Sequence, residues 1–248
     1  MNVQEMTSII IPSYNGLELL RSCIDSIRKW TEDPYEIIVV DNRSTDGTYE
    51  YCVSERIKVI SLPENRGFPK ACNSGLRIAR GGSLLLLNND VTVTRNWLAQ
   101  LKQGLFSDPA VGIAGPVTNY ASGIQQVEIA FDSKAQFLDI AAAHNEHDPS
   151  RWVEVPRIVG LCFLFKRELL EKIGYLDERF SPGHYEDDDY CYRARLAGYR
   201  LLVCGDTLVH HEGSVSFRKS GEDSLSQLVK RNHQLFIDKW QVDPLQFI

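Results

Sequence analysis

Apolar runs alternate with segments of helical periodicity through the first 116 residues. Each of the first four runs is followed by a helical segment before the next run begins. Continuous apolar strands that alternate with helices predict a mostly parallel sheet covered on both faces. The predicted fold class is therefore α/β. The five runs are residues 7–12, 35–41, 57–62, 83–87 and 111–116.

The first helical segment has a clear start signal. Its apolar positions Leu17, Leu20, Ile24 and Ile27 recur three or four residues apart. Asn15 precedes them, and Glu18 stands three positions later, so we expect Asn15 to cap this helix.

The pattern changes after Pro116. Residues 119–156 are polar and show no clear period, which predicts irregular structure, and "AAAHNEHDPS" at residues 141–150 is expected to be an insertion that is mobile or contacts a partner. Regular structure is expected to return with a strand at "IVGLCFLF", a helix at "KRELLEKIG", a strand at "YRLLVC" and an amphipathic segment near "LSQLVKRNHQLFIDKW". No repeat or low-complexity linker separates the halves, so we expect one shared core.

Composition narrows the class of protein. The 248 residues are 43% hydrophobic, which is enough for one large core, and the net charge of −6 argues against nucleic acid or an anionic membrane as a general partner. The six cysteines include no C-x-x-C pair, so we expect buried thiols in a reducing compartment. The sequence has neither a signal-peptide pattern nor an apolar run of membrane-span length, and we expect a cytoplasmic location.

Polar side chains follow three of the predicted strands at their carboxyl ends. The groups are Pro12 to Asn15, Asp41 to Arg43 and Asn88 to Asp90. A turn or a helix cap explains each group taken alone. In a parallel sheet, however, all three groups reach the edge where ligands bind, and together they favour a binding site.

Two of these carboxylates suggest specific chemistry. Asp41 ends a buried strand, where a carboxylate needs hydrogen-bond donors, and a nucleobase edge would supply them. Asp90 follows another apolar strand, with Asn88 on the same side of the pleat. Oxygen ligands at this spacing suit Mg²⁺ or Mn²⁺ shared with phosphates. No glycine-rich phosphate loop is present, so the metal would carry the diphosphate charge.

The segment "HYEDDDYCY" at residues 184–192 holds four consecutive acids. One interpretation is an acidic first helical turn, which the helix dipole favours. The other is a catalytic carboxylate, because crowded like charges raise proton affinity toward that of a useful base. Asp189 and Arg193 lie four apart, and we expect them to form an ion pair on one helix face.

Seven segments, in order, resemble the family-2 glycosyltransferases with the GT-A nucleotide-sugar-binding fold. The resemblance runs from about residue 7 to residue 216 and is weak over residues 119–156. It implies one domain over residues 1–248, with a Rossmann-like nucleotide-sugar half (about 1–116), an acceptor and catalytic half (about 117–220) and a C-terminal helical segment (about 221–248). The segments are "IIIPSYNG", "IIVVDNRSTDGT", "NRGFPKACNSG", "LLLLNND", "GYLDERF", "YEDDDYCYRARLAGYRL" and "LVHHEGS".

The resemblance also implies roles for donor-binding and metal-binding residues. The family's Asp-x-Asp metal motif falls on residues 88–90, where Asn88 replaces the first Asp and Asp90 remains the expected metal ligand. His211 matches a position near the metal and diphosphate, with His210 as the adjacent alternative. Gly160 is expected to permit close approach of donor sugar or acceptor. The residues expected around the nucleotide and its sugar are Pro12, Tyr14, Asn15, Asp41, Asn42, Asn65, Gly67, Lys70, Asn88, Asn89 and Gly160.

The implied reaction is an inverting, metal-dependent glycosyl transfer of hexosyltransferase type. By the resemblance, Asp187 is the base that deprotonates the acceptor hydroxyl, and Glu186 beside it contacts acceptor or donor sugar. The donor would be a UDP-, dTDP- or GDP-sugar, and the acceptor a glycan or a lipid-linked molecule that brings the enzyme to the membrane face. The "LLLLNND" variant resembles branches that build bacterial surface polysaccharides, including rhamnosyltransferases.

Two other classes of protein share some of these features. A nucleotidyltransferase would also join an α/β sheet, a nucleotide and a metal, but it should carry a glycine-rich basic loop where this chain has "PSYNGLELLRS". A non-catalytic sugar-binding module on a transferase fold would not need the intact "YEDDDY" and "NND" segments.

Overall fold

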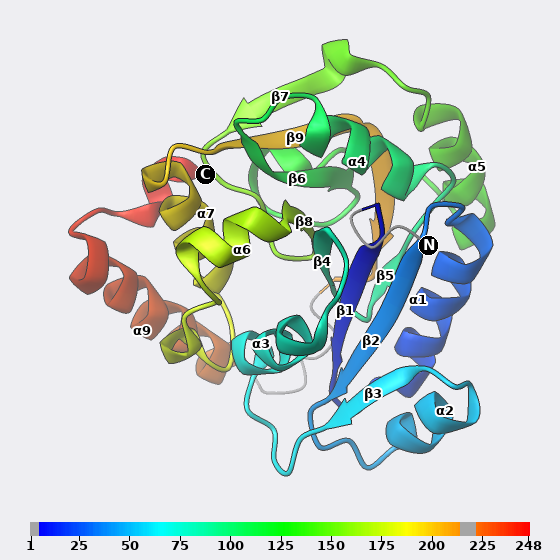
Figure 1. Cartoon of the computed structure of the whole chain (residues 1–248), viewed down its shortest axis with the longest axis horizontal. Coiled ribbons are helices and arrows are strands. Elements are labelled where there is room, and N and C mark those ends of the chain that lie inside the picture. Colours follow the sequence, from blue (N-terminus) through cyan, green and yellow to red (C-terminus); the bar gives the residue numbers. More distant parts are fainter. Residues whose placement is uncertain (1–4, 214–221) are drawn as a thin grey trace.

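The computed structural model describes residues 5–213 and 222–248 of the chain (Figure 1). Ser214, the last residue of the "LVHHEGS" segment, lies outside the described residues. All six cysteines lie within them and are buried and unpaired, as predicted. None of the helices in these two ranges is both long and apolar enough to cross a membrane.

A mixed sheet in the order β3-β2-β1-β4-β8-β6-β9-β5 forms the centre of the molecule, and β7 pairs with β9 beside this path. The prediction of a mostly parallel sheet is confirmed. The strands that run in one direction are β1 (Thr7–Ser13), β2 (Tyr35–Asp41), β3 (Lys58–Ser61), β4 (Ser83–Leu87), β6 (Val111–Thr118) and β9 (Arg200–His211). The opposite direction is taken by β5 (Val91–Thr92), β7 (Trp152–Val155) and β8 (Cys162–Lys166).

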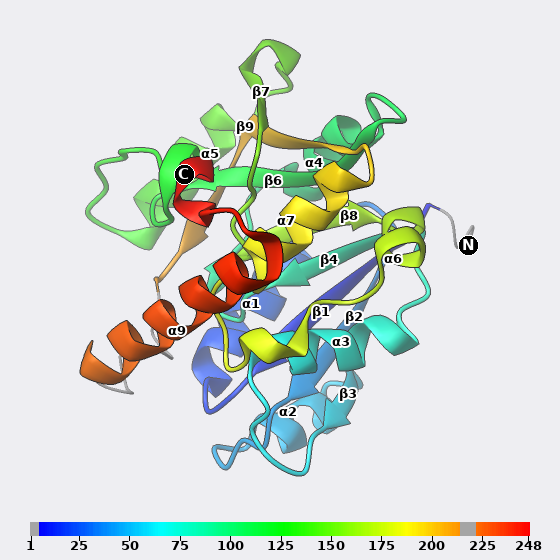
Figure 2. The ribbon, with the colours of Figure 1, turned by 90° about the vertical axis from the view of Figure 1, so that its left-hand side faces the viewer.

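Helices cover both faces of the sheet. Figure 2 shows α3, α7 and α9 on the viewer's side and α1 behind the sheet. Because side chains alternate along a strand, Leu84 and Leu86 of β4 pack into one core cluster while Leu85 and Leu87 pack into the other. The helices are α1 (Leu17–Trp30), α2 (Thr48–Ser54), α3 (Phe68–Ile78), α4 (Trp97–Phe106), α5 (Lys134–His144), α6 (Arg167–Ile173), α7 (Glu186–Leu196) and α9 (Glu222–Trp240).

The predicted cap of α1 is wrong. The capping position is Gly16, and the backbone N–H of Leu17 donates to Oδ2 of Asp46 at 2.9 Å. Asn15 instead takes a left-handed conformation, which asparagine tolerates, and its Oδ1 accepts from the N–H of Thr45 at 2.8 Å. Asn15 therefore joins the loops after β1 and β2.

The prediction that residues 119–156 are irregular is also wrong. The segment contains α5 and β7, together with short 3-10 turns at Gly123–Gln125 and Pro149–Arg151. On α5, Phe137 and Ala141 are buried, four residues apart, and two such positions give too weak a periodic signal to read from sequence. Strand β7 forms through its pairing with β9, which local sequence does not reveal.

Candidate active site

A cavity of about 580 Å³ opens where the carboxyl ends of β1, β2 and β4 meet the loops before β8 and α7. The sequence separates these groups by up to 175 positions, from Pro12 to Asp187, and the fold brings them together. The predicted site residues that line the cavity are Pro12, Tyr14, Asn42, Asn65, Gly67, Asn88, Asn89, Asp90, Gly160, Glu186, Asp187 and His211.

Three predicted donor-binding residues stand behind or beside the cavity lining. Asp41 is buried, and its Oδ1 accepts from the N–H of Ser44 at 3.0 Å, so it holds the loop after β2. Asn15 ties that loop to β1, as described above. The ammonium of Lys70 lies 3.6 Å from a carboxylate oxygen of Glu178, outside the lining residues.

Hydrogen bonds between strand ends shape the donor side of the cavity. Oδ1 of Asn42 accepts from the N–H of Arg66 at 2.8 Å, and its Nδ2 donates to the carbonyl of Gly67 at 3.2 Å. Nδ2 of Asn89 donates to Oγ of Ser13 at 3.0 Å. The end of β2 therefore fixes the loop before α3, and the end of β4 fixes the end of β1.

Position 67 requires glycine for two reasons, its backbone conformation and the close approach of a neighbouring loop. Its φ of +79° favours glycine, and an added Cβ would lie 2.5 Å from Cα of Pro182. The N–H of the next residue, Phe68, donates to the carbonyl of Pro182 at 2.8 Å. The nucleotide-side loop therefore packs directly against the loop that leads into α7.

His211 and Asp90 form one corner of the cavity. Nε2 of His211 lies 3.2 Å from Oδ1 of Asp90, without the alignment of a hydrogen bond. Nδ1 of His211 lies 2.8 Å from the carbonyl of Tyr120, so in the neutral ring this nitrogen carries the proton and Nε2 presents a lone pair. Burial lowers the pKa of His211, but the nearby carboxylate of Asp90, followed by the hydrogen bond to the carbonyl of Tyr120, outweighs burial and raises it.

This corner fits a divalent cation. Two ligand atoms at 2.1 Å from an octahedral cation stand about 3.0 Å apart, close to the observed separation. Oδ1 of Asn88 is buried without a hydrogen-bond partner and lines the same cavity. Within residues 5–213 and 222–248, no three His, Cys, Asp or Glu side chains converge as a metal-binding group. A cation here would therefore need an amide, water or phosphate oxygen beside Asp90 and His211.

His210 points away from this corner. Its ring packs edge-on against Phe131 and Phe137, with centroid distances of 5.6 and 4.8 Å. Adjacent residues on a strand face opposite sides, so only one of the two histidines can face the cavity. Of the two candidates, His211 is the one placed beside Asp90.

The acid cluster forms the first turn of α7, and each carboxylate has different surroundings. Oδ2 of Asp187 accepts from the N–H of Gly160 at 2.8 Å, and its Oδ1 accepts from the N–H of Asp188 at 3.0 Å. An added Cβ on Gly160 would lie 3.3 Å from this carboxylate. The close approach that the glycine allows is thus that of Asp187.

Glu186 and Asp188 are buried beside Asp187. Burial, reinforced by the charge of Asp187, raises the pKa of Glu186 well above its ordinary value. Burial and the same charge raise the pKa of Asp188 to about 8, against the opposing effect of Arg157. Nε of Arg157 lies 2.6 Å from Oδ1 of Asp188. Burial and the charge of Asp187 therefore favour the protonated forms of Glu186 and Asp188.

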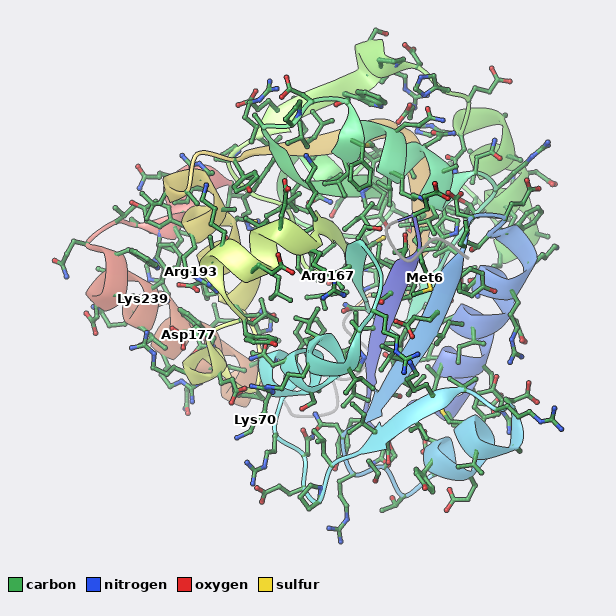
Figure 3. The ribbon with its side chains drawn as sticks, viewed as in Figure 1. Met6, Lys70, Arg167, Asp177, Arg193 and Lys239 are labelled. Atoms are coloured by element: carbon green, nitrogen blue, oxygen red, sulfur yellow. The ribbon has the colours of Figure 1, made fainter. Side chains whose placement is uncertain are left out.

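Asp189 belongs to the protein interior rather than to the cavity. Its Oδ2 accepts from Nε of Arg193 at 2.9 Å, which confirms the predicted ion pair. Its Oδ1 accepts from Nζ of Lys239 at 2.5 Å and from the indole N–H of Trp240 at 2.8 Å. Figure 3 shows Arg193, Lys239 and Asp177 gathered between α7 and α9.

Several cavity residues were not anticipated from the sequence. Arg157 carried a usable signal, because an arginine beside an apolar run and upstream of an acid cluster is a natural counter-charge. The others are loop or helix positions with no distinctive local pattern. They are Phe68, Tyr120, Ala121, Ser122, Val159, Leu161, Pro182, Gly183, His184, Leu225 and Leu228.

An α/β sheet with a polar cavity at its strand ends, an Asp-His corner and an acidic helix start matches the architecture of nucleotide-sugar transferases. Residues 8–174 match the model of glycosyl transferase family 2, and the chain belongs to this family. A solved mannosyltransferase from Pyrobaculum calidifontis, in complex with GDP-Man and Mn²⁺, is 25% identical with a TM-score of 0.64; the match covers 86% of this chain and 59% of that one.

Two curated relatives extend the comparison. The glycosyltransferase AglE of Haloferax volcanii is 32% identical over 212 residues, which cover 82% of this chain and 66% of AglE. The O-antigen biosynthesis protein RfbC of Myxococcus xanthus is 28% identical over 226 residues, which cover 84% of this chain and 17% of RfbC. The chain thus spans less than two thirds of the length of each.

Proposed function

We propose that this chain transfers a sugar, with inversion, from a nucleoside diphosphate sugar to an acceptor hydroxyl. One observation carries the proposal: the Asp90–His211 corner and the carboxylate of Asp187 line the same cavity. Such a transfer needs charge stabilisation at the leaving group and a base at the acceptor.

Asp90 and His211 would hold Mg²⁺ or Mn²⁺, with Asn88 orienting water or ribose. Bound there, the metal supplies positive charge to the diphosphate. The Mn²⁺ and GDP-Man in the mannosyltransferase neighbour support this assignment.

Asp187 accepts the proton of the acceptor hydroxyl as its oxygen forms a bond to the anomeric carbon. The bond from that carbon to the diphosphate oxygen breaks, and the nucleoside diphosphate leaves with the electron pair. The two backbone N–H groups of Gly160 and Asp188 orient the carboxylate for this role. Glu186, whose burial favours its protonated form, would donate a hydrogen bond to a sugar hydroxyl.

The two halves of the chain divide the work in this proposal. Residues 1–116 bind the nucleotide through the ends of β1, β2 and β4, with Pro12, Tyr14, Asn42, Asn65 and Gly67 along the cavity. Residues 117–220 supply the base and the acceptor side. The C-terminal segment from about residue 221 adds Leu225 and Leu228 to the cavity wall.

The proposed donor is a UDP-, dTDP- or GDP-sugar, and the proposed acceptor a glycan or lipid-linked molecule of a surface polysaccharide. The O-antigen role in the name of RfbC supports this setting.

Thermal-shift measurements with UDP, dTDP and GDP, each with and without Mn²⁺, select the base. Calorimetry and a product assay with UDP-glucose, dTDP-rhamnose and GDP-mannose then compare wild type with Asp187→Asn. We expect the variant to lose at least about 100-fold in turnover while nucleotide affinity stays unchanged. Full turnover in this variant would refute the base assignment.

A further inference from the structure

One side chain of α9 holds the loop that leads into the acidic turn of α7. Asn232 is fully buried, and its Nδ2 donates to the carbonyls of Phe180, Gly183 and His184 at 2.7, 2.8 and 3.0 Å. Its Oδ1 accepts from Nη2 of Arg231 at 2.8 Å. Every polar atom of this amide is therefore used, and three of its contacts are to one short loop.

That loop, residues 180–185, has a backbone that needs support. His184 and Tyr185 are consecutive non-glycine residues with φ values of +72° and +71°. Such conformations persist only where surrounding contacts impose them. Tyr185 is also the capping position of α7 and makes no side-chain capping hydrogen bond. The loop conformation thus sets where α7 begins.

The loop also forms part of the cavity. Pro182, Gly183 and His184 line it, and Glu186 and Asp187 follow directly in the chain. Gly67 packs against Pro182 from the nucleotide side, so the loop lies between that side and α9. A shift of the loop would move the first turn of α7 relative to a bound donor.

A second contact from α9 reaches the same turn of α7. Lys239 and Trp240 both donate to Oδ1 of Asp189, which is two residues after Asp187. α9 therefore holds the acidic turn from both sides, through the carbonyls before it and through a carboxylate within it. The ion pair between Asp189 and Lys239 also stabilises the packing of α7 against α9. The contacts of Asn232 go directly to the backbone of the loop, so Asn232 is the better probe of the loop conformation.

We propose that Asn232 is a positioning residue, which fixes the 180–185 loop so that Asp187 meets the acceptor at the correct distance from the donor. This inference rests on the proposed function, because it takes Asp187 as the base. Asn232 does not line the cavity and acts through the loop.

The informative substitution is Asn232→Asp, which keeps size and the acceptor for Arg231 but points an oxygen at three carbonyl oxygens. The matched control is Gln234→Glu, the same amide-to-carboxylate change on the exposed side of α9. A second control, Ile27→Ala, lowers stability from the buried side of α1 in the other core cluster. All variants are assayed below their melting transitions. Asn232→Ala removes the same hydrogen bonds to the loop carbonyls as Asn232→Asp without placing a negative charge beside them.

Two readouts separate positioning from stability. The first is turnover with UDP-glucose, dTDP-rhamnose or GDP-mannose and Mn²⁺, where we expect Asn232→Asp to lower kcat about 10- to 100-fold with KM for the donor little changed. The second is hydrogen exchange of the amides of residues 184–190 without substrate, which we expect to accelerate in Asn232→Asp and Asn232→Ala but in neither control.

The outcomes distinguish this inference from the proposed function. Unchanged exchange in the loop, or accelerated exchange with unchanged kcat, would overturn the positioning role. A kcat loss matched by Ile27→Ala at equal melting temperature would also overturn it, because stability alone would then explain it. If Asp187→Asn kept full turnover, the base assignment would fail, and the exchange measurement would still test the hold of Asn232 on the loop.

Discussion

The N–H of Gly160 donates a 2.8 Å hydrogen bond to Oδ2 of Asp187, across 27 positions of sequence. The other oxygen of Asp187 accepts from the N–H of Asp188. Each carboxylate oxygen has two lone-pair positions, so both oxygens retain an open site after these bonds. The carboxylate is thus fixed by backbone donors from two elements and can still accept a proton.

Gly160→Ala tests this arrangement. The new Cβ would stand 3.3 Å from both Cβ and Oδ2 of Asp187, closer than ordinary contact, so Asp187 must shift by a few tenths of an ångström. We expect kcat to fall about tenfold, with a stability loss of about 1 kcal/mol. Steady-state kinetics and urea unfolding measure the two effects. Wild-type kcat in this variant would show that the fixed carboxylate is not needed.

The neighbouring histidines allow a matched test of the metal corner. Asp90→Ala or His211→Ala should weaken nucleotide binding in the presence of Mn²⁺ at least about tenfold, because each removes a proposed ligand. Without metal, binding should be unchanged. Calorimetry with the selected nucleoside diphosphate, with Mn²⁺ and with EDTA, measures the difference.

His210→Ala is the control for that experiment. His210 packs between Phe131 and Phe137, so its loss should lower stability and leave the Mn²⁺-dependent part of binding intact. If His210→Ala removed the metal effect while His211→Ala preserved it, the assignment of the corner would be wrong.

The sequence predicted the sheet and most helices because burial leaves a strong local pattern. Buried parallel strands such as Leu84 to Leu87 are continuous apolar runs, and α1 repeats its apolar positions at helical spacing. The predictions that failed concern features that depend on contacts between segments distant in the sequence. The edge strand β7 exists through its pairing with β9, and Asp46 rather than Asn15 caps α1 because a loop distant in sequence arrives there.

The same distinction between local patterns and tertiary contacts applies to the residues of the site. Asp90 and the acid cluster at residues 186–189 stood out because carboxylates at the end of a buried strand or crowded together are costly unless they have partners or a function. The family resemblance then singled out Asp187 within the cluster. Asn232 did not stand out, because an asparagine in an amphipathic helix has no local signal, and its three carbonyl partners lie 48 to 52 positions away. Choosing between His210 and His211 likewise required the register of β9 against β5, which pairs Val91 with His211.

The acid cluster makes stability depend on pH. The folded-state pKa of Glu186 is raised by burial, whereas in the unfolded chain the group ionises near pH 4. Its stabilising contribution is therefore complete below about pH 4 and is lost as pH rises toward the folded pKa. Glu186→Gln keeps the shape and removes the titration, so we expect it to be more stable than wild type at pH 8 by about 1 kcal/mol or more.

Melting temperatures of wild type and Glu186→Gln from pH 4 to pH 8 check this expectation. The difference between the two proteins should grow with pH. Since Glu186 is a proposed sugar contact, the same variant should lose turnover while it gains stability. A difference that stayed constant with pH would mean that Glu186 titrates normally in the folded protein.

The contact between α7 and α9 predicts a specific loss of stability. Nζ of Lys239 donates to Asp189 at 2.5 Å and to Asp177 at 2.8 Å, and Asp189 is fully buried. Lys239→Met keeps a side chain of similar length but removes the ammonium that lies over the Trp240 ring, leaving Asp189 with Arg193 and the indole N–H alone. Because removing one partner of a buried pair costs about 3–5 kcal/mol and two donors remain, we expect a loss of about 2 kcal/mol in the free energy of unfolding.

Urea unfolding of Lys239→Met against Lys172→Met measures this contribution. The ammonium of Lys172 donates to the carbonyl of Ala197 and, like that of Lys239, lies over an aromatic ring, but its hydrogen bond is exposed, so its loss should cost no more than about 0.5 kcal/mol. Both substitutions remove one ammonium and keep a similar stem, so the contrast measures the contribution of the two carboxylates, Asp189 and Asp177, that Lys239 bridges. Equal losses would show that Arg193 and Trp240 satisfy Asp189 without Lys239, and that α9 is held to α7 by apolar packing instead.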